Sequence, residues 1–397
     1  MRENQPAERT VESLLERARD IAQLAAERTQ TIDQQRRLPD DLMKAMRDSG
    51  LLRILQPAHW GGYEMDLGTF VRVATEIAKG DASTGWVYCI FGIHNFWLGY
   101  VEPALQQEIW GKDASVVMAD SFAPVGKVQA VSGGYRLSGR WSFLSGLWCS
   151  EWVAVGALVA PEKGGNPEWT MFFLPKTDYR VDDQWHVVGM QGTDSNTIVV
   201  EDAFVPQHRV FWLERSQRTG EAPGHKLNTG PLYRLPFIPS LGIALTPAAV
   251  GAARTAVSHF QQWMQTRAPI YSTTPQQGMT TAQIALAEAS TTLDAVEGLM
   301  LRCADEIMAV YSAERRIPTE QERARYYAWR SYMVRQATRV VDRVFELSGG
   351  HAIYLQHPLQ RIWRDVHAAS QHLGLQFEFS MEAYGRTLVG LPSGSLV

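Results

Sequence analysis

GGYRLSGRWSFLSG, residues 133–146, lies in a chain of 397 residues and is the stretch that decides the fold. Its two leading glycines favour a tight turn, and the alternation that follows is typical of the second strand of a β-hairpin. Short runs rich in β-branched and aromatic residues come next, separated by Gly, Pro and Asn. These runs are EWVAVGALVA (151–160), EWTMFFLP (168–175) and NTIVVEDAFVP (196–206). We expect an antiparallel β-domain over residues 119–230.

Helical patterns flank this domain on both sides. Apolar residues recur three and four positions apart over residues 10–35, and shorter helical segments are expected over 39–50, 67–79 and 85–98. After residue 230 the helical pattern returns, and Thr280 with Gln283 and Thr319 with Glu322 have the spacing of a capping box. The sequence therefore predicts an α+β fold. We expect an N-terminal helical domain over 1–118 and a C-terminal domain of the four-helix-bundle type over 231–397.

Composition excludes several classes of function. The 38 Lys and Arg against 42 Asp and Glu give a net charge of −4 without a basic run, so we expect no nucleic-acid partner. Three distant cysteines predict neither a disulfide framework nor a zinc site, which favours the cytoplasm. Residues 82–101 and 235–253 lack charge, but the first contains His and Asn and the second three prolines. We interpret both as buried segments and expect no membrane partner.

The common catalytic fingerprints do not occur in the sequence. It contains no P-loop, no dinucleotide-binding G-x-G-x-x-G and no G-x-S-x-G. Asp365, His367 and His372 are two His and a carboxylate, but helical residues five apart point roughly 140° away from each other, so we expect no metal. His372 and Ser145 could each be an ordinary structural residue. Residue chemistry alone leaves open whether the chain is an enzyme or a binding protein.

Residues 133–146 resemble the flavin-contacting strand of the acyl-CoA dehydrogenase superfamily. In its pattern G-Y-x-L-x-G-x-K-x-W-I-T-N, Phe143 stands for the Trp and Ser145 for the Thr. The likeness covers nearly the whole chain and implies the helix, sheet, helix order already inferred. It extends to FVP (204–206), to the arginine of TRAPIY (Arg267), and to SGGHAIYLQHPLQRIWRDVH (348–367).

One departure from the dehydrogenases concerns their base. They carry Tyr-Glu-Gly-Thr eight residues after the Arg of their R-D motif, whereas this chain has His372-Leu373-Gly374-Leu375. Leucine cannot accept a proton. The chain instead resembles the two-component, group D flavin-dependent monooxygenases of the same fold, most closely the branch that hydroxylates a seco-steroid phenol and more distantly the p-hydroxyphenylacetate hydroxylases. The motifs are STGWV (83–87), SFAPVGK (121–127), RWSFLSG (140–146), VGMQGTDSN (188–196) and NTGPLYRLPF (228–237).

This resemblance implies the oxygenase component of a two-component monooxygenase. Reduced FMN or FAD from a separate NAD(P)H-dependent flavin reductase reacts with O2, and a C4a-hydroperoxyflavin hydroxylates a small phenolic or other aromatic substrate. The active form is expected to be a homotetramer. Three alternatives remain: N- or S-oxygenation of a heteroaromatic, an acyl-CoA dehydrogenase-like flavin oxidoreductase, and a flavin-binding protein without turnover. The choice of flavin, the size of the substrate and the position hydroxylated stay open.

The resemblance also assigns roles to residues. Ser145 would contact flavin N5, and His372 would either activate oxygen or deprotonate the phenol. His94 would face the substrate, unless it is a satisfied core histidine. Arg267 would bind a phosphate from a neighbouring subunit, because a guanidinium binds phosphate through two hydrogen bonds. The full expected flavin-binding set is Trp86, Asp120, Ser121, Phe122, Phe143, Leu144, Ser145, Arg267, Gly350, His351, His372 and Leu373.

Overall fold

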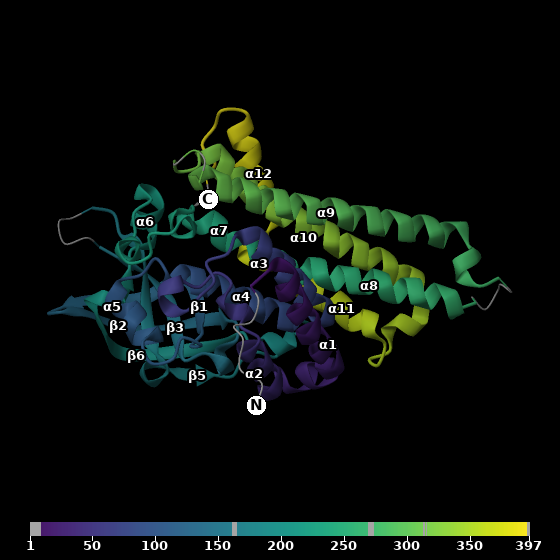
Figure 1. Cartoon of the computed structure of the whole chain (residues 1–397), viewed down its shortest axis with the longest axis horizontal. Helices are drawn as coiled ribbons and strands as arrows, with labels where there is room; N and C mark the ends of the chain where they lie inside the picture. The colour runs from purple at the N-terminus through teal and green to yellow at the C-terminus, as the bar shows by residue number, and fades with distance from the viewer. Residues whose placement is uncertain (1–8, 161–164, 269–273, 313, 315, 395–397) are drawn as a thin grey trace.

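The computed structural model describes residues 9–160, 165–268, 274–312, 314 and 316–394. Helices come first, a sheet follows, and a long helical bundle completes the chain (Figure 1). The predicted α+β class and element order are therefore confirmed. The boundaries proposed for the three domains remain a prediction.

The N-terminal helices follow the apolar periodicity closely. Thr10 caps the first helix by accepting a hydrogen bond from the Ser13 N–H at 3.2 Å. Two later helices, α3 and α4, lie so close that a Cβ on Gly85 would approach the Ala78 Cβ to 2.4 Å, so a glycine is required there. The helices are α1 (Val11–Gln35), α2 (Asp40–Asp48), α3 (Leu67–Gly80), α4 (Ala82–Leu98) and α5 (Pro103–Trp110).

The sheet has seven strands in the order β5-β6-β2-β1-β3-β4-β7. The quoted stretch forms β2 and pairs with β1 as the expected hairpin, with Val131 opposite Gly134. The expectation of a purely antiparallel domain is wrong at one pair, because β1 and β3 are parallel. The connection after β2 passes the end of β1, so β3 runs in the direction of β1. The strands are β1 (Met118–Val131), β2 (Gly134–Leu144), β3 (Trp152–Val159), β4 (Glu168–Pro175), β5 (Arg180–Asp182), β6 (Asn196–Pro206) and β7 (Val210–Phe211).

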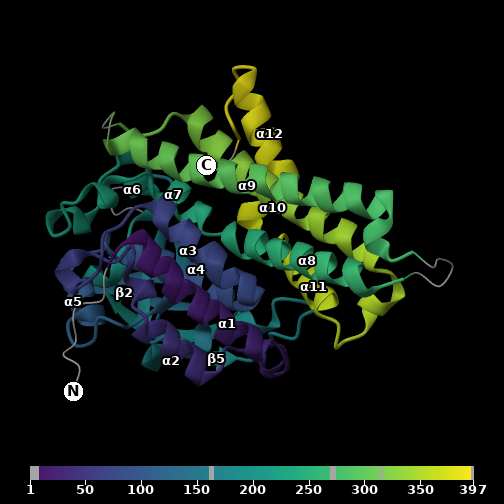
Figure 2. The same ribbon diagram turned by 45° about the vertical axis from the view of Figure 1, so that its right-hand side comes forward.

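The C-terminal part is a bundle of long helices that extends away from the sheet (Figures 1 and 2). One core unites the N-terminal helices with this bundle, and a second, smaller core lies within the sheet. The larger core also includes strand residues such as Ala154 and Phe173, so the N-terminal helices pack against both the bundle and the sheet. Its helices are α7 (Phe237–Ile243), α8 (Pro247–Thr266), α9 (Thr280–Ser312), α10 (Glu320–Ser348), α11 (Pro358–Ala369) and α12 (Phe377–Leu388), whereas the short helix α6 (Leu213–Thr219) packs against β4.

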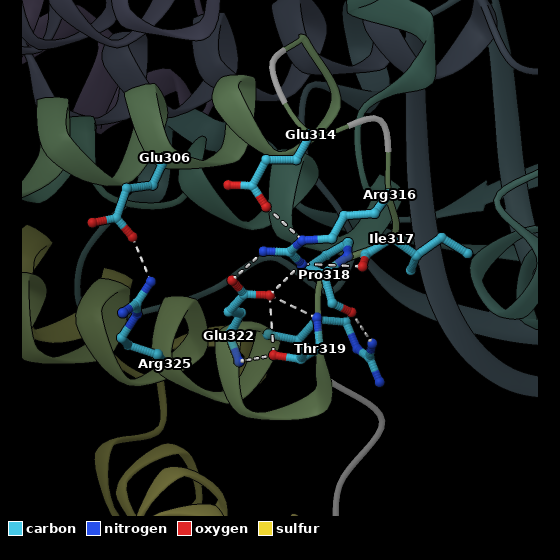
Figure 3. A network of polar contacts seen from close by, with 9 residues as sticks. Glu306, Glu314, Arg316, Ile317, Pro318, Thr319, Glu322 and Arg325 are labelled. Atoms are coloured by element: carbon cyan, nitrogen blue, oxygen red, sulfur yellow. Dashed lines mark hydrogen bonds and ion pairs between the residues drawn. The ribbon is translucent and has the colours of Figure 1, made fainter.

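Figure 3 shows the polar contacts at the start of α10. The predicted capping box forms: Thr319 Oγ1 accepts from the Glu322 N–H, and Glu322 accepts from the Thr319 N–H at 2.7 Å. Arg316 donates to the same carboxylate, which lowers the pKa of Glu322 to about 2. The other expected box is wrong, because α9 begins at Thr280 itself and the Gln283 amide donates to the Gln277 carbonyl.

Among the described residues, one helical stretch is long and apolar enough to cross a membrane. It spans Phe237–Thr266, and its most apolar window of 18 residues has a mean hydropathy of 1.3. Seventy-eight per cent of its most apolar window is buried inside the structure, which is common for core helices of soluble proteins.

Candidate active site

Three side chains from distant parts of the chain meet at one place. Trp86 on α4 donates its indole N–H to Ser145 Oγ at 3.0 Å, and its ring centroid lies 5.6 Å from that of His372. Ser145 directly follows β2, and His372 caps the short 3-10 helix Leu373–Leu375. The structure therefore brings together Trp86, Ser145 and His372.

The helix that carries Trp86 is fixed at its start. Asp81 is the N-cap of α4, and its carboxylate accepts hydrogen bonds from the Thr84 N–H at 2.8 Å and the Thr84 hydroxyl at 2.9 Å. Every residue of α4 is buried, so the helix cannot rotate without breaking the core. The indole is thus held in a fixed direction.

His372 has a defined tautomer. Its Nδ1 accepts from the Gly374 N–H at 3.0 Å, so the neutral ring carries its proton on Nε2. His372 is exposed to solvent at its surface, but the protein atoms packed around its ring desolvate it and lower its pKa to about 4; Asp120 raises this pKa, and Arg330 lowers it further. Arg330 also donates to the Gly374 carbonyl at 2.7 Å and so fixes the loop. The ring is therefore neutral at pH 7, with an N–H available to donate.

His94 and Asp120 form a second polar pair. His94 Nδ1 lies 2.7 Å from the Met118 carbonyl, and Nε2 lies 3.3 Å from Asp120 Oδ1. Burial alone would lower the pKa of His94, but the charge and hydrogen bond of Asp120, together with the carbonyl, raise it above its ordinary value. Since Asp120 also raises the pKa of His372, its carboxylate acts on both imidazoles.

The other flavin-binding residues expected in the sheet differ in their exposure and in their contacts. Phe143 is 71% exposed and has a left-handed φ of 68°, at an irregularity in the pairing of β2 with β6. Leu144 is fully buried in the sheet core, so no part of it is exposed to a ligand. Ser121 Oγ donates to the Ser142 carbonyl at 2.9 Å, and Phe122 stacks on Trp97 at 5.1 Å.

Arg267, Gly350 and His351 lie elsewhere. Arg267 is the C-cap of α8, and its guanidinium donates to the Ser348 carbonyl. Helix α8 ends at the part of the bundle away from the sheet (Figure 1). Gly350 and His351 belong to the adjacent 3-10 helix, and His351 lies 6.0 Å from Trp263. Within one chain these residues form a second group, separate from the centre formed by Trp86, Ser145 and His372.

Two residues of the centre had no role in the sequence analysis. Ser195 Oγ lies 2.8 Å from Ser145 Oγ and 2.7 Å from Thr193 Oγ1. Both belong to VGMQGTDSN, whose start is held by Asp365: its carboxylate accepts from the Met190 N–H at 2.6 Å. The sequence analysis identified this motif, but nothing in its residue pattern predicts that the Ser195 hydroxyl contacts Ser145, 50 residues away in the sequence.

No metal site is found in the part of the chain that the structure describes, where no three His, Cys, Asp or Glu residues are grouped suitably. Of the candidate set, Asp365 binds the Met190 amide, whereas His367 Nε2 lies 2.8 Å from Asp342.

A separate cleft of about 730 Å³ opens between α2 and the segment after β2. It contains charges of both signs, and its Arg47 is paired with Glu151 at 2.8 Å. None of the expected site residues lines it, so we place the candidate site at Trp86, Ser145 and His372. The cleft is lined by Asp40, Met43, Lys44, Arg47, Asp48, Gly50, Arg53, Tyr63, Asp113, Ser115, Trp148, Cys149, Ser150, Glu151 and Lys176.

Comparison with known proteins shows the family to which the chain belongs. Residues 8–101 match the family model "Acyl-CoA dehydrogenase, N-terminal domain" and residues 243–377 match "Acyl-CoA dehydrogenase, C-terminal domain". The oxygenase subunit HsaA of a flavin-dependent monooxygenase from Rhodococcus jostii (strain RHA1) is 38% identical, over 92% of this chain and 95% of that protein.

Two solved structures are similar over nearly the whole chain. The 3-HSA hydroxylase from Rhodococcus sp. RHA1 has a TM-score of 0.90 and 35% identity, covering 96% of this chain and 97% of that one. XiaF from Streptomyces sp., solved with FADH2 and glycerol, has a TM-score of 0.90 and 28% identity, covering 97% of each chain. The chain belongs to the flavin-dependent monooxygenase oxygenase subunits built on the acyl-CoA dehydrogenase fold.

Proposed function

We propose that this chain is the oxygenase component of a two-component system that hydroxylates a phenolic substrate with reduced FMN or FAD and O2. A separate NAD(P)H-dependent reductase supplies the flavin. The observation that carries the proposal is the meeting of Ser145 and His372 at Trp86, with Leu373 where a dehydrogenase would have its base. A seco-steroid phenol is the favoured substrate class, supported by the sequence resemblance and by the relative described as a 3-HSA hydroxylase.

The residues present fit an isoalloxazine ring. Phe143 and Leu373 are 71% and 70% exposed, and they flank the polar atoms of Ser145 and His372 in the sequence. Exposed apolar side chains next to defined polar groups suit a ring with apolar faces and polar edges. When bound, reduced flavin supplies the electrons that activate O2. Ser145 would accept a hydrogen bond from N5, and His372 would hold a proton at Nε2 toward the reacting oxygen.

His94 and Asp120 are proposed to bind the phenol hydroxyl. The Asp120 carboxylate offers an acceptor for the hydroxyl, and both this carboxylate and the His94 ring, whose Nε2 lies 3.3 Å from it, are largely buried. Transfer of the phenolic proton to the His94–Asp120 pair would make the ring more electron-rich, which favours attack on an electrophilic oxygen. The two histidines would then have different roles, because the pKa of His372 is lowered whereas that of His94 is raised. His372 would act on the reacting oxygen, and His94 on the phenol.

We propose a cytoplasmic homotetramer in which the Arg267 group serves the flavin phosphates of a neighbouring subunit. Within one chain, Arg267 lies at the end of α8 away from the sheet, which supports a role in another copy. Light scattering should give four times 44.5 kDa. A monomer with full activity would contradict this part of the proposal. Exposed apolar residues near this end and on α12 suit contact between copies: Ile353, Tyr354, Leu355, Phe379, Leu388 and Val389.

The main experiment measures product formed per reduced flavin supplied. Anaerobic protein with chemically reduced FMN or FAD is mixed with O2 and a panel of phenols, including a seco-steroid phenol, and hydroxylated product and H2O2 are quantified. His372→Ala should lower the product yield by about 100-fold, as loss of a general acid or base does, and release H2O2 instead. His59→Ala, at an exposed histidine, is the matched control.

Two outcomes would contradict the proposal. Normal coupling in His372→Ala would remove this residue from the chemistry. Bleaching of the oxidised flavoprotein by an acyl-CoA, without product from any phenol, would favour the dehydrogenase-like alternative instead.

A further inference from the structure

A chain of buried hydroxyl groups begins at Ser145. It runs from the Trp86 indole N–H through Ser145, Ser195 and Thr193 to the Met190 carbonyl, with successive distances of 3.0, 2.8, 2.7 and 2.8 Å. Ser145, Ser195 and Thr193 are 7%, 5% and 1% exposed. Each hydroxyl therefore finds its partners within the protein.

The two ends of this chain fix the direction of every hydrogen bond in it. An indole N–H can only donate and a carbonyl oxygen can only accept, while each hydroxyl has one hydrogen. The Thr193 hydrogen goes to the Met190 carbonyl, so Ser195 must donate to Thr193. Ser145 must in turn donate to Ser195, because the Ser195 hydrogen is already used.

Ser145 is left with one unused lone pair and no hydrogen to give. One lone pair accepts from Trp86, and its hydrogen is committed to Ser195. Flavin N5 carries a hydrogen when the ring is reduced and is a bare acceptor when the ring is oxidised. Ser145 in this state can satisfy only the reduced form.

We infer that Ser195 and Thr193 are positioning residues that make Ser145 an obligate acceptor and so set the preference of this site for reduced over oxidised flavin. The inference rests on the proposed function, since it takes Ser145 as the N5 partner. An oxidised ring would place two acceptors against each other, which costs a hydrogen bond and adds repulsion.

The loop that carries these hydroxyls is held from outside. Met190 and Asp194 have left-handed φ values of 56° and 46°, which are unfavourable for residues other than glycine. The buried carboxylate of Asp365 binds the Met190 N–H, and Trp185 donates to the Met190 carbonyl at 3.1 Å. The terminal acceptor of the hydroxyl chain is therefore fixed by α11 and by Trp185.

The test compares the affinities for oxidised and photoreduced FMN, measured without O2 and without substrate by absorbance and fluorescence titration. Ser195→Ala frees the Ser145 hydrogen, so the ratio of the two affinities should shift about tenfold toward oxidised FMN, the value of one hydrogen bond. Thr193→Val should shift it in the same direction, because Ser195 can then donate to Ser145. Met190 keeps its bond from Trp185 in that variant.

Two controls separate this effect from a general loss of packing. Ser195→Thr keeps a hydroxyl and should keep the wild-type ratio. Ser216→Ala, at an equally buried serine on α6, should not change it. Should one test variant fail to fold, the other decides.

The outcomes distinguish this inference from the proposed function. If the wild-type chain binds neither form of FMN or FAD, the proposed function fails. If it binds both forms equally, or if Ser195→Ala and Thr193→Val keep the wild-type ratio within twofold, the flavin site stands and the inference is overturned.

Discussion

Replacing Asp120 with asparagine should reverse the pH dependence of the stability that His94 contributes to the fold. His94 Nδ1 faces the Met118 carbonyl, an acceptor, so this nitrogen carries a proton. Its Nε2 faces the Asp120 carboxylate at 3.3 Å, and the pair raises the pKa of His94. Asparagine has the same shape, but it removes the charge and can donate its amide to a neutral Nε2.

The size and sign of the effect follow from this geometry. A charge-assisted hydrogen bond contributes about 2 kcal/mol. In the wild-type chain the folded pKa of His94 exceeds the unfolded value, so this stabilisation is complete below pH 6.5 and is lost as pH rises through the folded pKa. In Asp120→Asn burial dominates and lowers the pKa of His94, so the variant loses stability as pH falls below 6.5.

Urea unfolding of the two proteins at pH 6 and pH 8.5, at one protein concentration, measures this difference. The wild-type chain should exceed the variant by about 2 kcal/mol at pH 6 and by clearly less at pH 8.5. Asp202→Asn, at an Asp whose side chain is 74% exposed, is the matched control and should show little change. A stability difference for Asp120→Asn that is equal at both pH values, or larger at pH 8.5, would refute the reasoning.

Three further substitutions test other contacts. Gly85→Ala should lower the free energy of unfolding by about 1–3 kcal/mol, because the added Cβ would lie 2.4 Å from that of Ala78; an unchanged melting temperature would mean that α3 and α4 can separate freely. In urea unfolding, the stability of the wild-type chain should fall as the pH rises from 4 to 7, and Asp365→Asn should reduce this fall. Burial raises the pKa of Asp365 to about 7, and a carboxyl with a raised pKa stabilises the fold less as pH rises, here by at most about 4 kcal/mol; a variant that keeps the wild-type slope would count against this assignment. Thr319→Ala should cost about 1 kcal/mol by removing the cap of α10, whereas Thr319→Ser should not, and equal melting temperatures for both would speak against the cap.

Local patterns predicted most helices but not the direction of every strand. The spacing of apolar residues sufficed for α1 and α3, because a helix is formed by contacts between residues three and four apart. The parallel pairing of β1 with β3 depends on where the connection after β2 passes, and no residue in either strand records that path. The hairpin pattern therefore predicted that β2 pairs with β1, but not that β3 pairs with the other edge of β1.

The candidate site was predictable only as far as the family resemblance reached. It drew attention to Ser145 and His372, whose roles remain predictions. Ser195 was missed because its importance comes from a contact across 50 residues, and a serine in a loop has no distinguishing pattern. The tautomer of His372 likewise depends on one backbone N–H, that of Gly374.

The hydrogen-bond geometry explains why this centre needs support from three parts of the fold. Ser145 can be a pure acceptor only if the Met190 carbonyl stays at the end of the hydroxyl chain, and Met190 holds a left-handed backbone that favours other conformations. The buried Asp365 counters that preference from α11, while Arg330 on α10 holds the Gly374 carbonyl beside His372. Both supports come from the C-terminal bundle, whereas Ser145 and Met190 follow strands of the sheet. The polarity of the site is thus a property of the contact between sheet and bundle, and a change that loosens this contact would act on flavin preference and on the His372 tautomer together.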